Sequence, residues 1–168
     1  TYPIFEAFST QNLPLEQTLL PLFKRKVQNY FNQSISDWDT SNVSNMANMF
    51  RSTSLVQPIG SWNTSKVTEM QSMFAYTPFN QPINYNSVTN AWNTANVTNM
   101  KEMFRDATQF NQPLNSWNTS AVTDMSFIFS GASSFNQAIG SWDTSAVINM
   151  SAMFYDASSF NQEISSWN

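Results

Sequence analysis

The chain has 168 residues, of which 41% are hydrophobic and 15% aromatic, so it holds enough apolar volume for one folded domain. Its net charge of −4 and its few Lys and Arg residues argue against nucleic-acid binding, which relies on many basic contacts to phosphate. The absence of Cys and His excludes disulfides and thiolate metal sites and removes the commonest catalytic base. No apolar run approaches the ~20 residues of a membrane span, so we expect none.

The first 30 residues do not share the pattern of the rest of the chain. Leu19, Leu22, Phe23 and Val27 have helical spacing and predict a helix that follows an extended N-terminal lead. The end of a repeat stack exposes apolar side chains unless it is covered. We therefore interpret residues 1–30 as an N-terminal arm and capping helix.

Residues 31–168 form an internal repeat. Trp recurs at intervals of 24, 30, 25, 25 and 25 residues, at Trp38, Trp62, Trp92, Trp117, Trp142 and Trp167. The copies are five near-complete units and a terminal half unit, NQEISSWN, and an insertion of six residues at 85–90 accounts for the long interval. Self-similarity at a fixed period indicates a solenoid.

One segment of each unit has the spacing of a helix. From Val43 to Phe50, for example, apolar residues stand at positions i, i+3, i+6 and i+7. These positions form one stripe on a helix, and the Thr and Ser that precede them are favourable N-cap residues. We expect a short helix of about two turns, or its 3₁₀ equivalent, in each unit.

The other segment of each unit has the pattern of a strand. Phe110 and Leu114, four residues apart, would lie on one face of an extended chain, and Pro113 is tolerated near the start of a strand. We expect these segments to pair in parallel with their copies. The expected fold class is therefore an α/β repeat solenoid, a stack of short parallel strands and short helices.

The repeated phrase FNQxIxSWDTSxVTNMxxMF resembles the repeat of the BspA-like leucine-rich repeat surface proteins, in the variant of mycoplasma surface lipoproteins, over residues 31–168. The resemblance implies a right-handed, leucine-rich-repeat-like solenoid and an extracellular or cell-surface location. It also implies adhesion or host interaction in some members and no shared catalytic residues. Met, Trp and Phe stand where ordinary leucine-rich repeats have Leu, so the curvature of a standard horseshoe is not implied.

Residues that recur in every unit favour structural roles, because a residue needed once for chemistry has no reason to be repeated. The Met column that includes Met46 and Met70 could bind a soft metal, but its spacing favours core packing. The Trp column could stack sugar rings, but its register with Ile and Phe favours a structural stack. Asp39 and Asp143 could belong to a calcium ladder, but three of the five residues in their column are Asn, which favours a turn role. Asn-Gln pairs predict amide ladders. We expect no metal, no cofactor and no enzymatic activity.

The two ends of the solenoid are the basis for the hypothesis that the protein assembles with itself. The C-terminal half unit has no cap after it in this sequence, and an uncapped coil exposes apolar side chains and an open edge. A contact between two different surfaces of the same protein builds open fibres unless it closes into a ring. The predicted interface consists of Tyr2, Ile4 and Phe5 at one end and Phe160, Ile164 and Trp167 at the other.

The leading hypothesis is a non-enzymatic extracellular structural or interaction protein that associates head to tail with copies of itself. The alternative is a surface adhesin module that binds a protein or glycan through one face of the solenoid or through loop 85–90, with Tyr85, Asn86 and Asn90 as its ligand residues. Six Asn-x-Ser/Thr sequons are candidate N-glycosylation sites in either case: Asn32, Asn42, Asn63, Asn96, Asn118 and Asn149.

Overall fold

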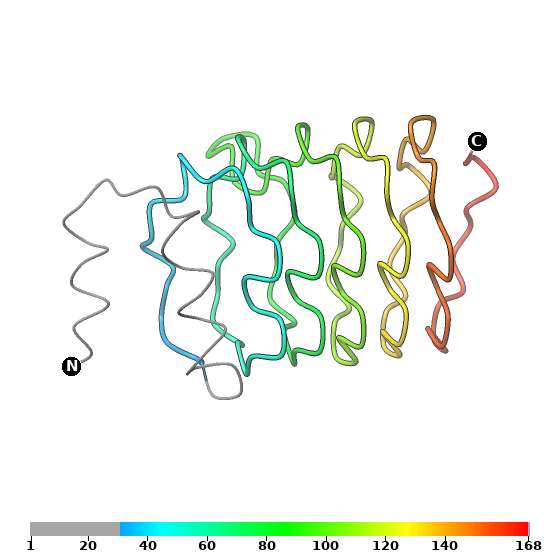
Figure 1. The fold of residues 1–168 in the computed structure, drawn as a ribbon, viewed down its shortest axis with the longest axis horizontal. Helices are drawn as coiled ribbons and strands as arrows, with labels where there is room; N and C mark the ends of the chain where they lie inside the picture. Colours follow the sequence, from blue (N-terminus) through cyan, green and yellow to red (C-terminus); the bar gives the residue numbers. More distant parts are fainter. Residues whose placement is uncertain (1–30, 168) are drawn as a thin grey trace.

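The computed structural model of the protein describes residues 31–167, so the predicted arm and capping helix of residues 1–30 lie outside the described residues. The described chain winds into five coils, at residues 31–54, 55–78, 79–109, 110–134 and 135–159, and a half coil at 160–167. We number these coils 1 to 5 and call the last segment half coil 6. Successive coils lie side by side along the long axis of the molecule (Figure 1), and equivalent residues form columns along the stack.

The prediction of an α/β solenoid built from short helices and short parallel strands is wrong. Residues 31–167 contain no α-helix and no β-strand, and only isolated bridges mark sheet-like pairing. The parallel bridges join one column, Asn45, Glu69, Asn99, Asp124 and Asn149. This column lies in the segment that was predicted to be helical. The leucine-rich-repeat-like arrangement of helices and strands is therefore replaced by a stack of turns.

Chained β-turns take the place of the predicted helices. In coil 1 the N–H of Met49 donates to the carbonyl of Met46, and a second turn of this kind closes over residues 50–53. The third residue of each turn, Asn48 and Ser52, has a φ of 60° and 59°, as a type II turn requires. A turn returns residues three apart to the same side of the chain, as a helix does. The apolar spacing therefore fits both structures.

Two columns of the stack hold the left-handed backbone conformation. The first consists of Asn48, Ser72, Glu102, Phe127 and Ala152, and the second of Ser52, Tyr76, Asp106, Gly131 and Asp156. Only Gly131 is a glycine, although this conformation costs an L-residue about 1–2 kcal/mol. Residues with φ near +55° cannot belong to a right-handed helix, so these columns exclude the predicted helices.

Hydrogen bonds between coils compensate for this conformation. In coil 1, the N–H groups of Met46, Asn48, Phe50 and Ser52 donate to carbonyls of coil 2 at 2.8–3.0 Å. The same four positions of coils 2, 3 and 4 donate to the following coil at 2.7–3.0 Å. We call these four donors of each coil the N–H row. One bond in each of these steps, such as that from the N–H of Thr68 to the carbonyl of Ser44, runs in the opposite direction, and the step between coils 2 and 3 has a second, from the N–H of Trp92 to the carbonyl of Trp62.

Side chains make the contacts between coils in the segments that were predicted to be strands. The indole Nε1 of Trp117 donates to the carbonyl of Ile83 in the preceding coil at 2.8 Å. Asn111 Oδ1 accepts from the N–H of Asn136 and from Nε2 of Gln137, both at 2.9 Å. This confirms the predicted amide ladder. The indole and amide side chains bond the backbone groups of the neighbouring coil, and the chain turns at each Trp. The backbones therefore form no ladder of hydrogen bonds with each other in this segment, and the predicted strands are absent.

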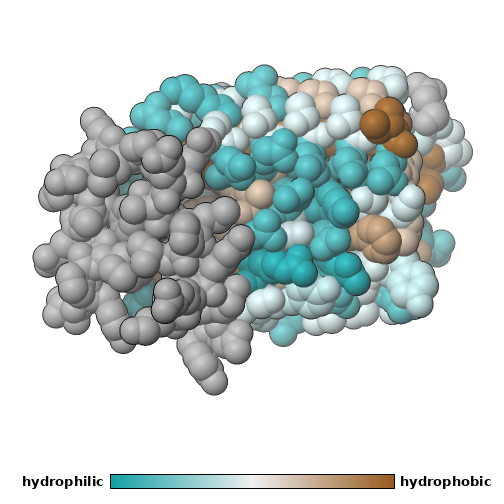
Figure 2. Space-filling view, in the orientation of Figure 1, coloured by the Kyte–Doolittle hydropathy of each residue, from teal (hydrophilic) through white to brown (hydrophobic). Residues whose placement is uncertain are grey.

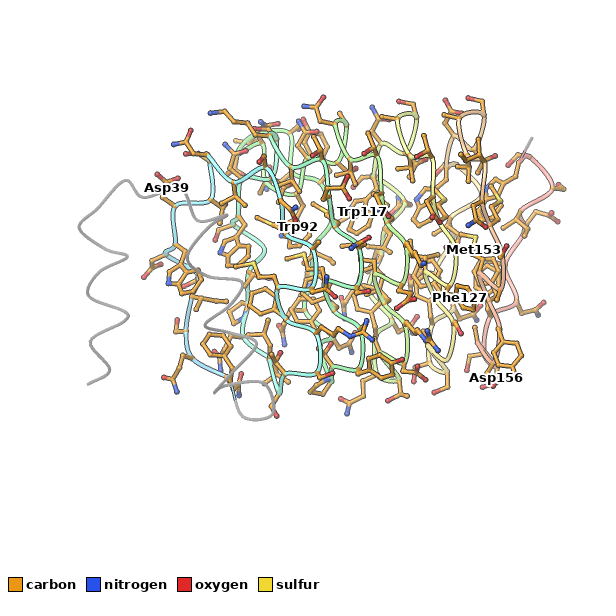
Figure 3. The ribbon with its side chains drawn as sticks, viewed as in Figure 1. Asp39, Trp92, Trp117, Phe127, Met153 and Asp156 are labelled. Carbon is orange, nitrogen blue, oxygen red and sulfur yellow. The ribbon has the colours of Figure 1, made fainter. Side chains whose placement is uncertain are left out.

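Columns of aromatic rings fill the core. Phe104 lies 4.0 Å from Phe110 and 5.6 Å from Phe129, measured between ring centroids. Trp92 and Trp117 stack at 6.2 Å with an angle of 3° between their planes (Figure 3). The Met column is buried from Met46 to Met125, beside the Val and Phe columns. The core roles predicted for the Trp and Met columns are therefore confirmed.

A buried Thr column also joins each coil to the next. Thr94 is 1% exposed, and its hydroxyl donates to the carbonyl of Asn118 at 2.9 Å. Thr40, Thr64 and Thr119 make the equivalent bond. The residue before each Thr caps a turn: Asn93 Oδ1 accepts the N–H of Ala95 at 3.0 Å, an Asx turn. Asp39 and Asp143 do the same, which confirms their predicted turn role.

Replacing Thr94 by Val keeps the shape of the side chain and removes the hydroxyl. The Asn118 carbonyl then loses this donor, so we expect the free energy of unfolding to fall by about 1–3 kcal/mol. Denaturant titration followed by tryptophan fluorescence measures this change. Thr94→Ser retains the hydroxyl and should lose less. Equal unfolding free energies for Thr94→Val and the wild type would contradict the role of this bond.

Replacing Ala152 by Gly should stabilise the protein. Ala152 is exposed and has a φ of 51°, which Gly adopts without the steric cost that a Cβ atom adds. We expect a gain of about 0.5–1 kcal/mol in the free energy of unfolding. Ala146 is the matched control, because its φ is not positive and Gly there should cost about 0.5–1 kcal/mol. A loss of stability in both variants would show that the left-handed column is not strained.

Candidate functional site

Half coil 6 brings together the three C-terminal residues of the predicted interface. Trp167 stacks on Trp142 at 6.4 Å, and its indole donates to the carbonyl of Ile139 at 3.2 Å. Phe160, Ile164 and Trp167 pack against the core but are only half-buried. One coil earlier, Ile139 is 0% and Trp142 3% exposed. The half coil therefore repeats the internal packing with one face uncovered in this structure.

Polar groups are also open at this end of the stack. The N–H groups of Met150, Ala152, Phe154 and Asp156 continue the N–H row but have no acceptor among residues 31–167. Figure 2 shows hydrophilic surface over the middle of the stack and the most hydrophobic surface toward the C-terminal end. Ile148 and Tyr155, in coil 5, are 87% and 65% exposed. Apolar surface and unpaired donors thus coincide on the last coils.

The opposite end is described only from coil 1 onward. Tyr2, Ile4 and Phe5, predicted as the other half of the interface, lie outside the described residues. Within coil 1, Trp38 and Met49 are half-buried and pack against the core. The backbone carbonyls at positions 45, 47, 49 and 51, which correspond to the acceptors of the N–H row in later coils, receive no hydrogen bond from residues 31–167.

The inserted loop is a small ordered turn on the side of coil 3. An antiparallel bridge joins Asn86 to Ala91, and Asn86 Oδ1 accepts the N–H groups of Val88 and Thr89. Val88 is 92% exposed at the tip, and Tyr85 is 37% exposed. Asn90 is half-buried, and its Oδ1 accepts a hydrogen bond from Asn93 at 2.9 Å. Of the three predicted ligand residues, Tyr85 and Asn86 therefore face solvent, while Asn90 supports the base of the loop.

The six sequon residues all have structural hydrogen bonds. Asn42, Asn96 and Asn118 are exposed, and Asn32, Asn63 and Asn149 are half-buried. Asn96, for example, donates from Nδ2 to the carbonyl of Ser65 at 2.7 Å, and Asn42 Oδ1 accepts from the Lys66 ammonium at 2.7 Å. Glycosylation at Asn96 would attach the sugar to the same Nδ2 atom that donates this bond.

A lateral cluster of charged and aromatic residues was not predicted from the sequence. The guanidinium of Arg51 lies 4.9 Å from the ring centroid of Tyr76, and that of Arg105 lies 5.5 Å from the ring centroid of Phe127. Glu102 pairs with both Arg51 and Arg105, at 3.2 and 3.5 Å. Because these residues do not recur from unit to unit, the repeat pattern gave no signal for them. The internal charge pairing favours a lateral tie across coils 1 to 4 over a ligand site.

Three acidic side chains have altered titration. The pKa of Asp39 lies below its ordinary value because the side chain and then the backbone N–H of Ser41 donate to it. The pKa of Asp143 is lowered in the same way by Ser145. Hydrogen bonds from Ser165, first from its backbone and then from its side chain, lower the pKa of Glu163. All three carboxylates are exposed and belong to turns, and none faces another carboxylate in a catalytic pair.

The described residues hold no cluster of metal-ligating side chains. In residues 31–167, no group of three or more His, Cys, Asp or Glu side chains could hold a metal ion. No helix in that range is long and apolar enough to cross a membrane. Two exposed features for which the described contacts give no structural role are therefore the C-terminal half coil and the loop at 85–90.

Comparison with known proteins gave one match. The model of a family described as Mycoplasma protein of unknown function, DUF285, matches residues 17–91 and again residues 79–168. The two matches overlap at residues 79–91 and together cover most of the chain. No curated protein and no solved structure matched the chain.

The lowered pKa values predict a loss of stability in acid. A carboxyl group with a lower pKa in the folded state contributes stability above its unfolded pKa of about 4, and this is lost as the pH falls through the folded value. Asp39→Asn/Asp143→Asn keeps the Asx turn, since Asn occupies this column in coils 2 to 4. We expect the melting temperature of this variant to fall less than that of the wild type between pH 5 and about pH 3. Parallel melting curves at every pH would contradict the contribution of these carboxylates.

Proposed function

We propose that the chain, which belongs to the Mycoplasma protein family of unknown function DUF285, is a non-enzymatic structural protein. It associates with copies of itself through its C-terminal coil. The observation that supports this proposal is that the half-buried Phe, Ile and Trp columns of half coil 6 lie beside N–H groups of coil 5 that have no acceptor among residues 31–167. Both kinds of group are satisfied one coil earlier, where the next coil covers them. A coil-like partner would satisfy both at once.

We also propose that the repeat belongs with the BspA-like repeats and that the protein acts outside the cell or at its surface. The repeated phrase from Phe31 onward supports the first statement, and the surface location of that family supports the second. The columns of Trp, Met, Asn and Thr have structural contacts in the described coils, which leaves the uncovered end as the candidate for interaction.

A second candidate function is adhesion through the loop at 85–90. Its support is the 92% exposure of Val88 at the tip of a loop that leaves the solenoid. An ordered loop on a rigid scaffold often carries recognition. A protein or glycan partner would then contact Tyr85, Asn86 and Val88, and the C-terminal coil would not be needed.

The variant Ile164→Asp/Trp167→Ala tests self-association. It places a charge in the half-buried Ile column and removes the terminal indole, so we expect sedimentation velocity to show monomers where the wild type shows larger species. Val88→Asp is the control, since it adds the same charge outside the C-terminal coil. Circular dichroism and thermal melting check that each variant is folded.

A wild type that remains monomeric at high concentration, with no filaments by electron microscopy, would overturn the proposed function. If the wild type and Ile164→Asp/Trp167→Ala bind a surface ligand equally while Val88→Asp does not, the adhesin function is supported instead.

A further inference from the structure

We infer that the lateral face of coils 4 and 5 binds the guanidinium group of an arginine from a partner protein, at a site made by Phe127, Tyr155 and Asp156. The inference comes from the way the chain holds its own arginines in the lateral cluster of coils 1 to 4. It goes beyond the proposed function, because the site lies outside half coil 6 and does not depend on self-association.

The lateral cluster alternates arginine side chains and aromatic rings along the stack. The guanidinium of Arg51, in coil 1, lies 4.9 Å from the ring centroid of Tyr76, in coil 2. The guanidinium of Arg105, in coil 3, lies 5.8 Å from the Tyr76 centroid and 5.5 Å from that of Phe127, in coil 4. All three distances are within the range of about 6 Å for cation–π attraction. The series therefore ends on an aromatic ring.

Arg105 shows what surrounds a guanidinium on this face. Besides the two rings, it has two carboxylates: its Nη1 lies 3.5 Å from Glu102 Oε1, and its Nε lies 3.5 Å from Asp106 Oδ2. A guanidinium is planar and weakly hydrated, so it can stack on a ring while its N–H groups face carboxylates. Aromatic faces combined with acidic side chains thus make an arginine site in this fold.

Coil 5 repeats this setting without the arginine. The N–H of Gly131 donates to the carbonyl of Tyr155 at 2.7 Å, which fixes the register of coils 4 and 5. In this register, Tyr155 occupies the column of Arg105, and Asp156 occupies the column of Asp106. Coil 5 therefore keeps the carboxylate but has an aromatic ring where coil 3 has its guanidinium.

The three groups of the proposed site are accessible. Tyr155 is 65% exposed, Asp156 is exposed and Phe127 is half-buried. Ala152, which follows Phe127 in its column, is too small to cover the ring. Within residues 31–167, the Asp156 carboxylate has no hydrogen-bond or ion-pair partner, and the Phe127 ring stacks on no other ring. Phe127 and Asp156 lie toward the same edge of the stack (Figure 3).

The charge of this part of the chain favours a cationic partner. Residues 106–168 contain no Lys or Arg and five acidic residues: Asp106, Asp124, Asp143, Asp156 and Glu163. No basic side chain of these coils therefore competes for Asp156. A cation–π contact at an exposed site changes affinity only roughly two- to fivefold. The arginine is thus one contact within a larger interface with the partner protein.

Titration of the isotope-labelled chain with N-acetyl-arginine amide, followed by NMR, tests the site. We expect the amide resonances of Phe127, Tyr155 and Asp156 to shift as the concentration of the probe rises. The shifts should be smaller in high salt, because salt screens exposed charges. N-acetyl-citrulline amide has nearly the same shape without the charge and should leave these resonances unchanged.

Two variants each remove one group from the site. Asp156→Asn removes the charge and keeps the backbone, because Asn also adopts the left-handed conformation of Asp156, whose φ is 55°. Tyr155→Ala removes the exposed ring. We expect each variant to bind the probe roughly two- to fivefold more weakly. Asp143→Asn and Ile148→Ala are the matched controls, because they remove an exposed charge and an exposed apolar side chain from other columns of coil 5.

Equal shifts in the wild type, Asp156→Asn and Tyr155→Ala would overturn this inference. Equal binding of N-acetyl-lysine amide would overturn the assignment to a guanidinium, since an ammonium group cannot stack flat on a ring. Circular dichroism checks that the variants are folded. The measured resonances belong to coils 4 and 5, so a monomeric wild type that shows these shifts would overturn the proposed self-association and leave this site in place.

Discussion

The N–H row that each coil donates to the next is the constraint on which the rest of the fold depends. To point four donors per coil along the stack, the backbone must turn between them, and the left-handed residues at Asn48 and Ser52 and their counterparts make those turns. The turns direct Val, Met and Phe inward, where they build the core. Each coil depends on its neighbours for hydrogen bonds as well as for burial, so a single coil has no stable structure of its own.

The two halves of a coil are hydrogen-bonded to the neighbouring coil through different groups. The half that carries the N–H row uses backbone donors, and the half from Phe to Trp uses indole and amide side chains, as at Trp117 and Asn111. This division explains the composition of the chain. Its low charge and abundance of Asn, Ser and Thr provide short polar groups that fit between closely stacked coils, where long charged side chains would not.

The repeat, its register and its core could be predicted from the sequence, because Trp spacing and apolar columns depend only on which residues face inward. The local backbone could not. The pattern from Val43 to Phe50 fits a helix and a chain of turns equally well, and left-handed residues such as Glu102 and Phe127 are not glycines, so they gave no signal. The C-terminal residues of the proposed interface stay a prediction, because no observed contact with another chain tests them. The cluster around Tyr76 was not predicted, since it occurs once.

The one-way direction of the N–H row also has an electrical consequence. Each peptide unit has a dipole of about 3.5 D, and such dipoles add when they are aligned. In each of the four steps between coils 1 and 5, four aligned units oppose one or two that point the other way. The stack therefore resembles a broad helix with a positive pole at its C-terminal end, where Asp156 and Glu163 supply compensating negative charge. A row of copies joined head to tail would add these moments, and its total moment would grow with its length.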